Sequence, residues 1–172
     1  IGTWAAILNA VPRSRLILKA KALCDDATVT RITESFALHG IDPKRIECLS
    51  WIVDSSPLAA YHRVDIALDT FPYNGTTTTC EALWMGVPTV TLAGDWHAAR
   101  VGVSLMTKLG LNDWIATDRN AYVMLAVERA NRLDALAHVR SGLRNRMANQ
   151  GLTDGARFVT NLEAAYREAW NK

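Results

Sequence analysis

The chain has 172 residues, of which 49% are hydrophobic and 21% are charged, the balance of an ordinary soluble globular protein. This length suffices for one domain with a substantial core and excludes two large domains. A formal net charge of +2 gives no reason to expect binding to nucleic acid or to a membrane surface. No apolar run approaches the ~20 residues that span a bilayer, so no membrane partner is expected.

The cysteines and histidines do not have the spacing of metal ligands. Cys24, Cys48 and Cys80 form no Cys-x-x-Cys pair, which argues against a zinc site and against a disulfide framework. The histidines also lack metal spacing. We therefore expect no metal, no other cofactor, and a reducing, cytoplasmic compartment.

The first half of the chain alternates helical and extended patterns. A helix is predicted over residues 3–10, and because the chain starts at Ile1-Gly2 within this pattern, without an initiator methionine, we expect a piece of a longer protein. The next predicted elements are a strand over 15–20, a helix from Asp25 or Asp26 to about residue 39, a strand over 45–49, a helix from Ser56-Pro57 to residue 63, and a strand over 65–69.

The second half continues this alternation and then becomes helical. The predicted elements are a helix from residue 76 to 85, a strand over 88–92, a helix over 96–109, a strand over 113–116, and two or three helices between 118 and 170. Strands that alternate with helices at this spacing are typical of a parallel sheet. The predicted fold class is therefore α/β, a Rossmann-like doubly wound parallel sheet that forms one domain over residues 1–172.

The most informative segment is the stretch from Asp69 to Glu81, Asp-Thr-Phe-Pro-Tyr-Asn-Gly-Thr-Thr-Thr-Thr-Cys-Glu. Residues 70–79 are called the threonine loop below. The first amides of a helix lack partners, and the helix dipole favours an anion there. A single threonine suffices as a helix cap, and capping alone is the alternative to a binding site. The concentration of four threonines at the end of a strand instead favours a phosphate site, formed by Asn74, Gly75, Thr76, Thr77 and Thr78.

Other polar residues are expected at the same edge of the sheet. Glu81 lies one turn further along the helix, where its carboxylate can accept two ribose hydroxyls or merely complement the helix dipole. Lys19 and Lys21 follow the first strand and carry compact charges suited to phosphate, although solvated lysines are as common at a strand end. His97 follows the fourth strand and is expected to face the same cleft.

Several enzyme classes lack their signatures in this sequence. The chain contains no GxSxG, no Walker sequence and no GxGxxG. Hydrolase, nucleoside triphosphatase and ordinary dehydrogenase functions therefore lose support.

The same residues resemble a known family. The stretch from Leu68 through Asp-Thr-Phe-Pro-Tyr-Asn-Gly-Thr-Thr-Thr-Thr-Cys-Glu to Leu92 is similar to the signature of the protein O-GlcNAc transferase and SPINDLY family. The stretches that begin at Ile7, His97 and Leu162 fit as well. Members carry tetratricopeptide repeats followed by a two-lobed GT-B glycosyltransferase, which moves a sugar to Ser or Thr of proteins without a metal. The resemblance implies that this chain is the C-terminal, nucleotide-sugar-binding lobe.

The resemblance also implies roles for particular residues. Thr76–Thr78 would hold the diphosphate and Glu81 the ribose, and the backbone near Ile52 would face the base. The Phe-Pro-Tyr-Asn-Gly pattern is closer to the SPINDLY branch, which includes plant enzymes resembling GDP-fucose protein O-fucosyltransferases. The expected donor is therefore UDP-GlcNAc or GDP-fucose, and the acceptor is a protein. In that branch Lys19 becomes the candidate catalytic residue, with Lys21 a nucleotide-sugar contact.

The chain departs from the family pattern in its base clamp and at its start. Asp54, Pro57 and Ala60 stand where O-GlcNAc transferases have a Lys, a His and an Arg. The first strand, the N-terminal catalytic lobe and the repeats would precede residue 1, so the isolated chain is expected to be inactive and to self-associate through an exposed sheet edge. Two alternatives stay open: a non-catalytic nucleotide-binding or protein-interaction domain, and an epimerase-type GT-B enzyme, which the long threonine motif disfavours.

Overall fold

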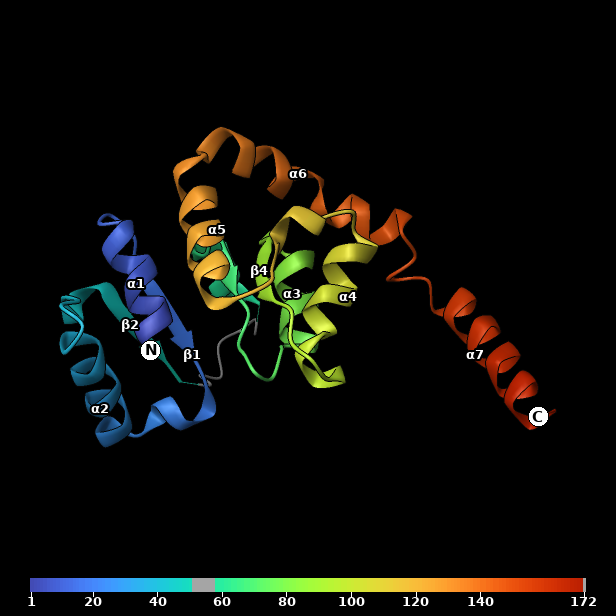
Figure 1. Cartoon of the computed structure of the whole chain (residues 1–172), viewed down its shortest axis with the longest axis horizontal. Helices are drawn as coiled ribbons and strands as arrows, with labels where there is room; N and C mark the ends of the chain where they lie inside the picture. The colour runs from blue at the N-terminus through green and yellow to red at the C-terminus, as the bar shows by residue number, and fades with distance from the viewer. Residues whose placement is uncertain (51–57, 172) are drawn as a thin grey trace.

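The computed structural model describes residues 1–50 and 58–171 and shows parallel strands flanked by helices (Figure 1). The elements before residue 51 are α1 (Gly2–Ala10), β1 (Leu16–Lys19), the 3-10 helix η1 (Lys21–Cys24), α2 (Asp26–Ala37), the 3-10 helix η2 (Pro43–Arg45) and β2 (Ile46–Leu49). Those between residues 58 and 116 are η3 (Ala59–Arg63), β3 (Ala67–Leu68), α3 (Thr77–Trp84), β4 (Thr89–Leu92), η4 (His97–Ala99), α4 (Val101–Lys108), η5 (Asn112–Trp114) and β5 (Ile115–Ala116). The rest is helical: α5 (Arg119–Asn131), α6 (Leu133–Asn149) and α7 (Gly155–Trp170).

β1 and β2 form a parallel pair, in which Leu16 lies opposite Ile46 and Lys19 opposite Leu49. α2 begins where Asp25 accepts a hydrogen bond from the N–H of Thr28 at 2.8 Å, as expected of an N-cap. The core of this part joins α1, α2 and β2 through Ala5, Leu8, Phe36, Ile41 and Ile46.

β3, β4 and β5 form a second parallel sheet with β4 in its centre. Helices α3, α4 and α5 all contact β4, and α1 packs against α5. The core here includes residues from each of these elements, such as Ile7, Leu83, Val90, Met106 and Tyr122. Ile7 belongs to α1, so α1 connects this core to the β1–β2 part. The predicted α/β class with parallel strands is confirmed.

Several predicted elements differ from the structure. The helix expected over 96–109 is instead η4 followed by α4, with the break at Arg100. The strand expected over 65–69 forms its ladder only at Ala67 and Leu68. The predicted helix start at Ser56-Pro57 lies outside the described residues, and the residues after it form the 3-10 helix η3. The break at Arg100 has a physical cause in the threonine loop, described below.

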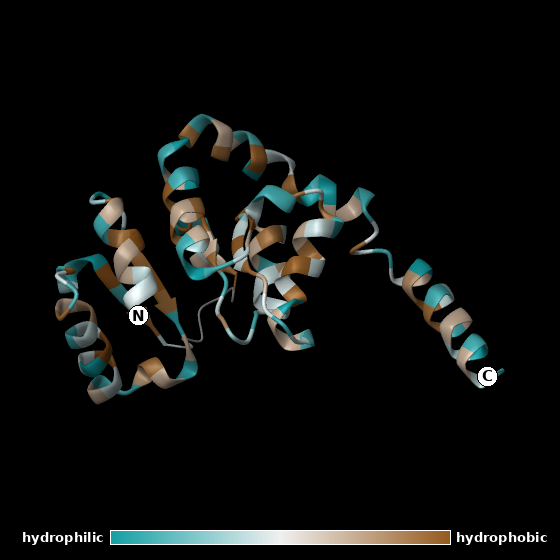
Figure 2. Ribbon diagram, viewed as in Figure 1, coloured by the Kyte–Doolittle hydropathy of each residue, from teal (hydrophilic) through white to brown (hydrophobic). Residues whose placement is uncertain are grey.

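The last helix, α7, extends away from the rest of the chain (Figure 1). Along its described length no residue is buried, and Figure 2 shows apolar residues interspersed with polar ones on it. Phe158 is 64% exposed, Tyr166 67% and Trp170 90%. Among the described residues, no helix is both long and apolar enough to cross a membrane.

Candidate functional site

The threonine loop connects β3 to α3 at the carboxyl end of the second sheet. Thr76 precedes the first turn of α3, and its side chain does not cap this helix. Thr76, Thr77 and Thr78 are exposed, and their hydroxyls form no hydrogen bond within the described part of the chain. Uncapped amides at a helix start, beside unpaired hydroxyls, are groups that bind an anion.

Beneath the loop lies the carboxylate of Asp69, which is 5% exposed. One oxygen, Oδ1, accepts the N–H of Gly75 at 2.7 Å, and the other, Oδ2, accepts the hydroxyl of Thr91 at 2.7 Å. Burial raises the pKa of the Asp69 carboxyl, while these hydrogen bonds and one from the backbone of Thr70 act to lower it. The main chain of Asp69 is held as well, because its carbonyl accepts the hydroxyl of Tyr122 at 2.9 Å.

Asn74 is 0% exposed and occupies the gap between η4 and α4. In a continuous helix the N–H of Gly102 would bond to the carbonyl of Ala98. Instead the N–H of Asn74 donates to the carbonyl of Ala98 at 2.9 Å, and the N–H of Gly102 donates to Asn74 Oδ1 at 3.2 Å. Asn74 therefore replaces both ends of one helical hydrogen bond, which explains the break at Arg100. Its Nδ2 donates to the carbonyl of Thr70 at 3.0 Å.

Two glycines fit this arrangement because they lack a side chain. A Cβ on Gly75 would lie 2.6 Å from Thr79 Oγ1 and 2.7 Å from Thr78 Oγ1. A Cβ on Gly102 would overlap Thr91 Oγ1 and Asp69 Oδ2. Glycine at both positions therefore lets the loop and α4 approach the Asp69 carboxylate more closely than a residue with a side chain would permit.

Glu81 is half-buried on α3 and is joined to η3 through Tyr61. The hydroxyl of Tyr61 lies 3.0 Å from the carbonyl of Thr78, to which it donates, and 3.4 Å from Glu81 Oε2. Burial, with the nearby Glu81 carboxylate, raises the pKa of Tyr61 to about 12, so this hydroxyl keeps its proton at neutral pH. Tyr61 consequently fixes both the first turn of α3 and the carboxylate that follows it.

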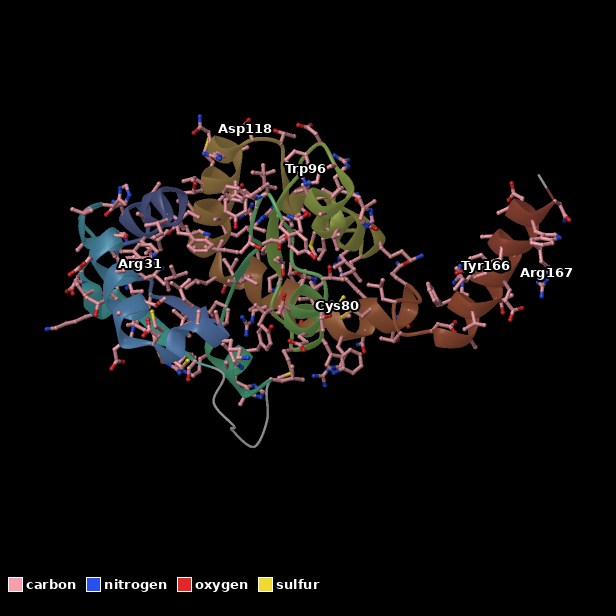
Figure 3. All side chains as sticks on the ribbon, turned by 90° about the horizontal axis from the view of Figure 1, so that it is seen from below. Arg31, Cys80, Trp96, Asp118, Tyr166 and Arg167 are labelled. Carbon is pink, nitrogen blue, oxygen red and sulfur yellow. The ribbon has the colours of Figure 1, made fainter. Side chains whose placement is uncertain are left out.

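The other predicted site residues lie in different places. His97, exposed, opens η4 and directly precedes Ala98, whose carbonyl holds Asn74, so it lies beside the threonine loop. Trp96 is 56% exposed in the same segment, and Figure 3 shows it on the main body, far from α7. Lys19 ends β1 and Lys21 opens η1, both exposed and in the β1–β2 part rather than in the sheet that carries the loop. Ile52 lies outside the described residues.

Asn74 and Gly75, predicted as ligand contacts, use polar groups within the protein, and their direct contact with a ligand stays a prediction. The polar atoms of Asn74 are buried and used within the protein, and the N–H of Gly75 is taken by Asp69. Sequence reasoning missed the roles of Asp69, Thr91 and Tyr61. The role of Asp69 could have been inferred from the sequence, because it is a charged residue at the end of an apolar strand. No sequence pattern indicated the roles of Thr91 and Tyr61.

No group of three or more His, Cys, Asp or Glu side chains that could hold a metal ion occurs within residues 1–50 and 58–171. The outer side of the loop and the start of α3 present hydroxyls, backbone amides and the half-buried carboxylate of Glu81.

The fold and the loop together define a class: a parallel α/β lobe whose polar loop lies at the carboxyl end of a strand, where open α/β sheets bind their ligands. The sequence profile of glycosyl transferase family 41 matches residues 1–162. The chain belongs to this family.

Individual relatives agree with this membership. Over 170 residues the chain is 47% identical to a protein of Oryza sativa subsp. japonica described as the probable UDP-N-acetylglucosamine–peptide N-acetylglucosaminyltransferase SPINDLY, covering 98% of this chain and 18% of that protein. It is 28% identical over 169 residues to the UDP-N-acetylglucosamine–peptide N-acetylglucosaminyltransferase of Caenorhabditis elegans, covering 98% of this chain and 14% of that protein. The chain thus spans less than a fifth of the length of these relatives.

A solved structure agrees in three dimensions. A mutant of the Thermobaculum terrenum O-GlcNAc transferase superposes with a TM-score of 0.93 at 40% identity, over 98% of this chain and 32% of that one. The expected resemblance to O-GlcNAc transferases and SPINDLY proteins is confirmed, as is the fold of a C-terminal GT-B lobe.

Proposed function

We propose that this chain is the donor-binding lobe of a longer protein O-glycosyltransferase, which transfers a sugar from a nucleoside diphosphate to Ser or Thr hydroxyls of proteins. The observation that carries the proposal is the start of α3, where uncapped amides adjoin the exposed, unpaired hydroxyls of Thr76–Thr78. Membership of glycosyl transferase family 41 supports a nucleotide sugar as the anion bound there.

The chemistry needs a group that stabilises the departing diphosphate. As the acceptor oxygen bonds to the anomeric carbon, the bond from that carbon to the β-phosphate oxygen breaks, and negative charge develops on the β-phosphate. Fixed amides and hydroxyls directed at this charge lower the barrier, because they need no reorganisation during the reaction. In this proposal Thr76–Thr78 and the first amides of α3 supply these hydrogen-bond donors. No metal takes part, and the configuration at the anomeric carbon is inverted. The acceptor, its general base and the rest of the cleft would come from the remainder of the polypeptide.

The nucleoside part of the donor is assigned to the neighbouring side chains. Glu81, held by Tyr61, has a carboxylate that can accept the two ribose hydroxyls. The names of the relatives specify UDP-N-acetylglucosamine, and GDP-fucose is the other donor that the sequence pattern suggests. We keep both donors in the proposal, with Lys19 as candidate catalytic residue and Lys21 and His97 as candidate nucleotide-sugar contacts.

The test is nucleotide binding by the full-length protein that contains these residues. Calorimetry with UDP, GDP, UMP and GMP would compare the unsubstituted protein with a Thr77→Val, Thr78→Val double variant. Two lost hydrogen bonds to a charged ligand should weaken diphosphate binding about 100-fold. Thr107→Val is the matched control, since Thr107 is exposed on α4 and outside the loop. Unchanged diphosphate affinity in the double variant would contradict the assignment of the loop.

A second candidate, a non-catalytic nucleotide-binding or interaction domain, has one observation in its favour. Ala60, half-buried in η3, stands where the family has a clamp residue, and its methyl group cannot grip a base. Transfer of a labelled sugar to protein by the full-length chain separates the two functions. Nucleotide binding without transfer would favour the second, and thermal stabilisation by none of the four nucleotides would favour an interaction domain.

A further inference from the structure

We propose that Asp69 and Thr91 form a positioning pair, which sets the geometry of the phosphate-binding loop through Gly75 without touching the nucleotide. The inference rests on the proposed function and adds to it a group of residues behind the loop. It predicts that a hydroxyl on β4, beneath the surface, controls the affinity for the β-phosphate.

The carboxylate of Asp69 divides its two oxygens between two elements. Oδ1 holds the N–H of Gly75 in the loop, and Oδ2 holds the hydroxyl of Thr91 on β4, each at 2.7 Å. Thr91 is 0% exposed, and β4 is the central strand of its sheet. The chain of contacts therefore runs from the central strand of this sheet to the residue just before the threonines.

The backbone of Asp69 is fixed independently of its side chain. Its N–H donates to the carbonyl of Val90 at 2.9 Å, and its carbonyl accepts the hydroxyl of Tyr122 at 2.9 Å. With both main-chain groups held, the carboxylate has little freedom to follow the loop. The loop instead adopts the position that the carboxylate dictates.

The consequence for the loop concerns which donors remain for a ligand. Because the N–H of Gly75 is bonded to Asp69, it is not available as a donor to a ligand. The donors that remain for the ligand are the amides and hydroxyls from Thr76 onward. Since a Cβ on Gly75 would lie within 2.7 Å of Thr78 Oγ1 and 2.6 Å of Thr79 Oγ1, the threonine hydroxyls are packed directly around this anchored glycine. A shift of Gly75 would move them with it.

The chain contains a matched comparison for Thr91. Thr89 lies two residues earlier on β4, and residues two apart in a strand share one face of the sheet. Thr89 is 1% exposed, yet its hydroxyl has no hydrogen-bond partner in the described part of the chain. The same substitution at the two positions therefore removes a hydroxyl with a partner in one case and without a partner in the other.

The experiment measures the affinities of the full-length protein for UDP, GDP, UMP and GMP by calorimetry, in Thr91→Val, Thr91→Ser and Thr89→Val variants. The readout is the ratio of diphosphate to monophosphate affinity, which general loosening of the fold would leave unchanged. We expect Thr91→Val to lower this ratio about tenfold, Thr91→Ser to keep it within about threefold, and Thr89→Val to leave it unaltered.

The outcomes separate the inference from the proposed function. If the unsubstituted protein binds none of the four nucleotides, both are overturned. If it binds a diphosphate and Thr91→Val keeps the ratio, or Thr89→Val lowers it equally, only the positioning pair is overturned. Hydrogen exchange in the unsubstituted protein needs no variant to fold: the Gly75 amide should exchange at least about 100-fold more slowly than that of Thr77, and equal rates would also overturn the pair.

Discussion

The two faces of the threonine loop use their polar groups in opposite ways. On the outer face, the hydroxyls of Thr76–Thr78 are exposed and unpaired within the described residues. On the inner face, both carboxylate oxygens of Asp69 and both polar side-chain atoms of Asn74 have partners. Donors on the outer face are left free for a ligand because the polar groups beneath them already have other partners. Changes to the inner face should therefore cost stability and alter binding only through the position of the loop, whereas changes to the outer face should cost binding directly.

The largest effect is expected where the inner face has no room. Gly102→Ala would place a methyl group against Asp69 and Thr91 and should lower the free energy of unfolding by about 3 kcal/mol. Urea denaturation would measure it. The control is Gly142→Ala in α6, where the nearest atom to a new Cβ is Arg146 Nε at 3.9 Å; there the better helix propensity of alanine should add up to about 1 kcal/mol. Equal effects at the two sites would contradict the close packing around Asp69.

A smaller loss of stability is expected at the hydroxyl of Thr91. Thr91→Val leaves Asp69 Oδ2 buried without its donor, which should cost about 2 kcal/mol. Thr89→Val removes a buried hydroxyl that lacks a partner among the described residues, so it should be neutral or stabilising by about 1 kcal/mol. Thermal and urea unfolding of both variants would reveal the sign. A destabilised Thr89→Val variant would mean that the hydroxyl of Thr89, like that of Thr91, contributes to stability, and would contradict the difference between the two positions.

Tyr61 lies at the border between the two faces, so its removal should affect binding more than folding. Tyr61→Phe deletes the hydroxyl that holds Thr78 and Glu81, and we expect about fivefold weaker nucleotide binding, equivalent to about 1 kcal/mol. Tyr166→Phe on α7, where the side chain is 67% exposed, is the matched control. Calorimetry would compare them, and equal affinities would remove Tyr61 from the site.

The smallest effect is a dependence of stability on pH. Burial raises the pKa of Asp69 from its ordinary value of 3.8, so its contribution to stability is fully present below that value and is lost as pH rises through the raised pKa. Asp69→Asn cannot titrate. The free energy of unfolding of the unsubstituted protein, relative to this variant, should therefore decline as pH rises from about 4 towards neutrality. Urea titrations over that range would check it, and a difference that grows with pH would contradict the direction of the shift.

The sequence predicted the outer face of the loop and most of the elements. Asn74-Gly75 marked the turn, the threonines marked the helix start, and strands such as Leu16–Lys19 and Thr89–Leu92 followed from their apolar runs. These features depend on neighbours in the chain, which a pattern can represent.

The inner face was not predicted, because its contacts join residues far apart in the sequence. Asp69 meets Thr91 22 residues later and Tyr122 53 residues later, and Asn74 reaches Gly102 across 28 residues. The last contact also overrode local helix propensity and divided the helix expected over 96–109. No local pattern specifies which distant amide a buried asparagine will meet.

The detached position of α7 has a consequence for proteolysis of the 172-residue chain. A helix of this length without a buried face is marginal in water, so its local opening costs little free energy. Trypsin should therefore cut at Arg157 and Arg167, in α7, long before it cuts at Arg140 in α6, whose guanidinium donates to the carbonyls of Val64 and Asp65. The first stable product would end at Arg157, with the threonine loop intact.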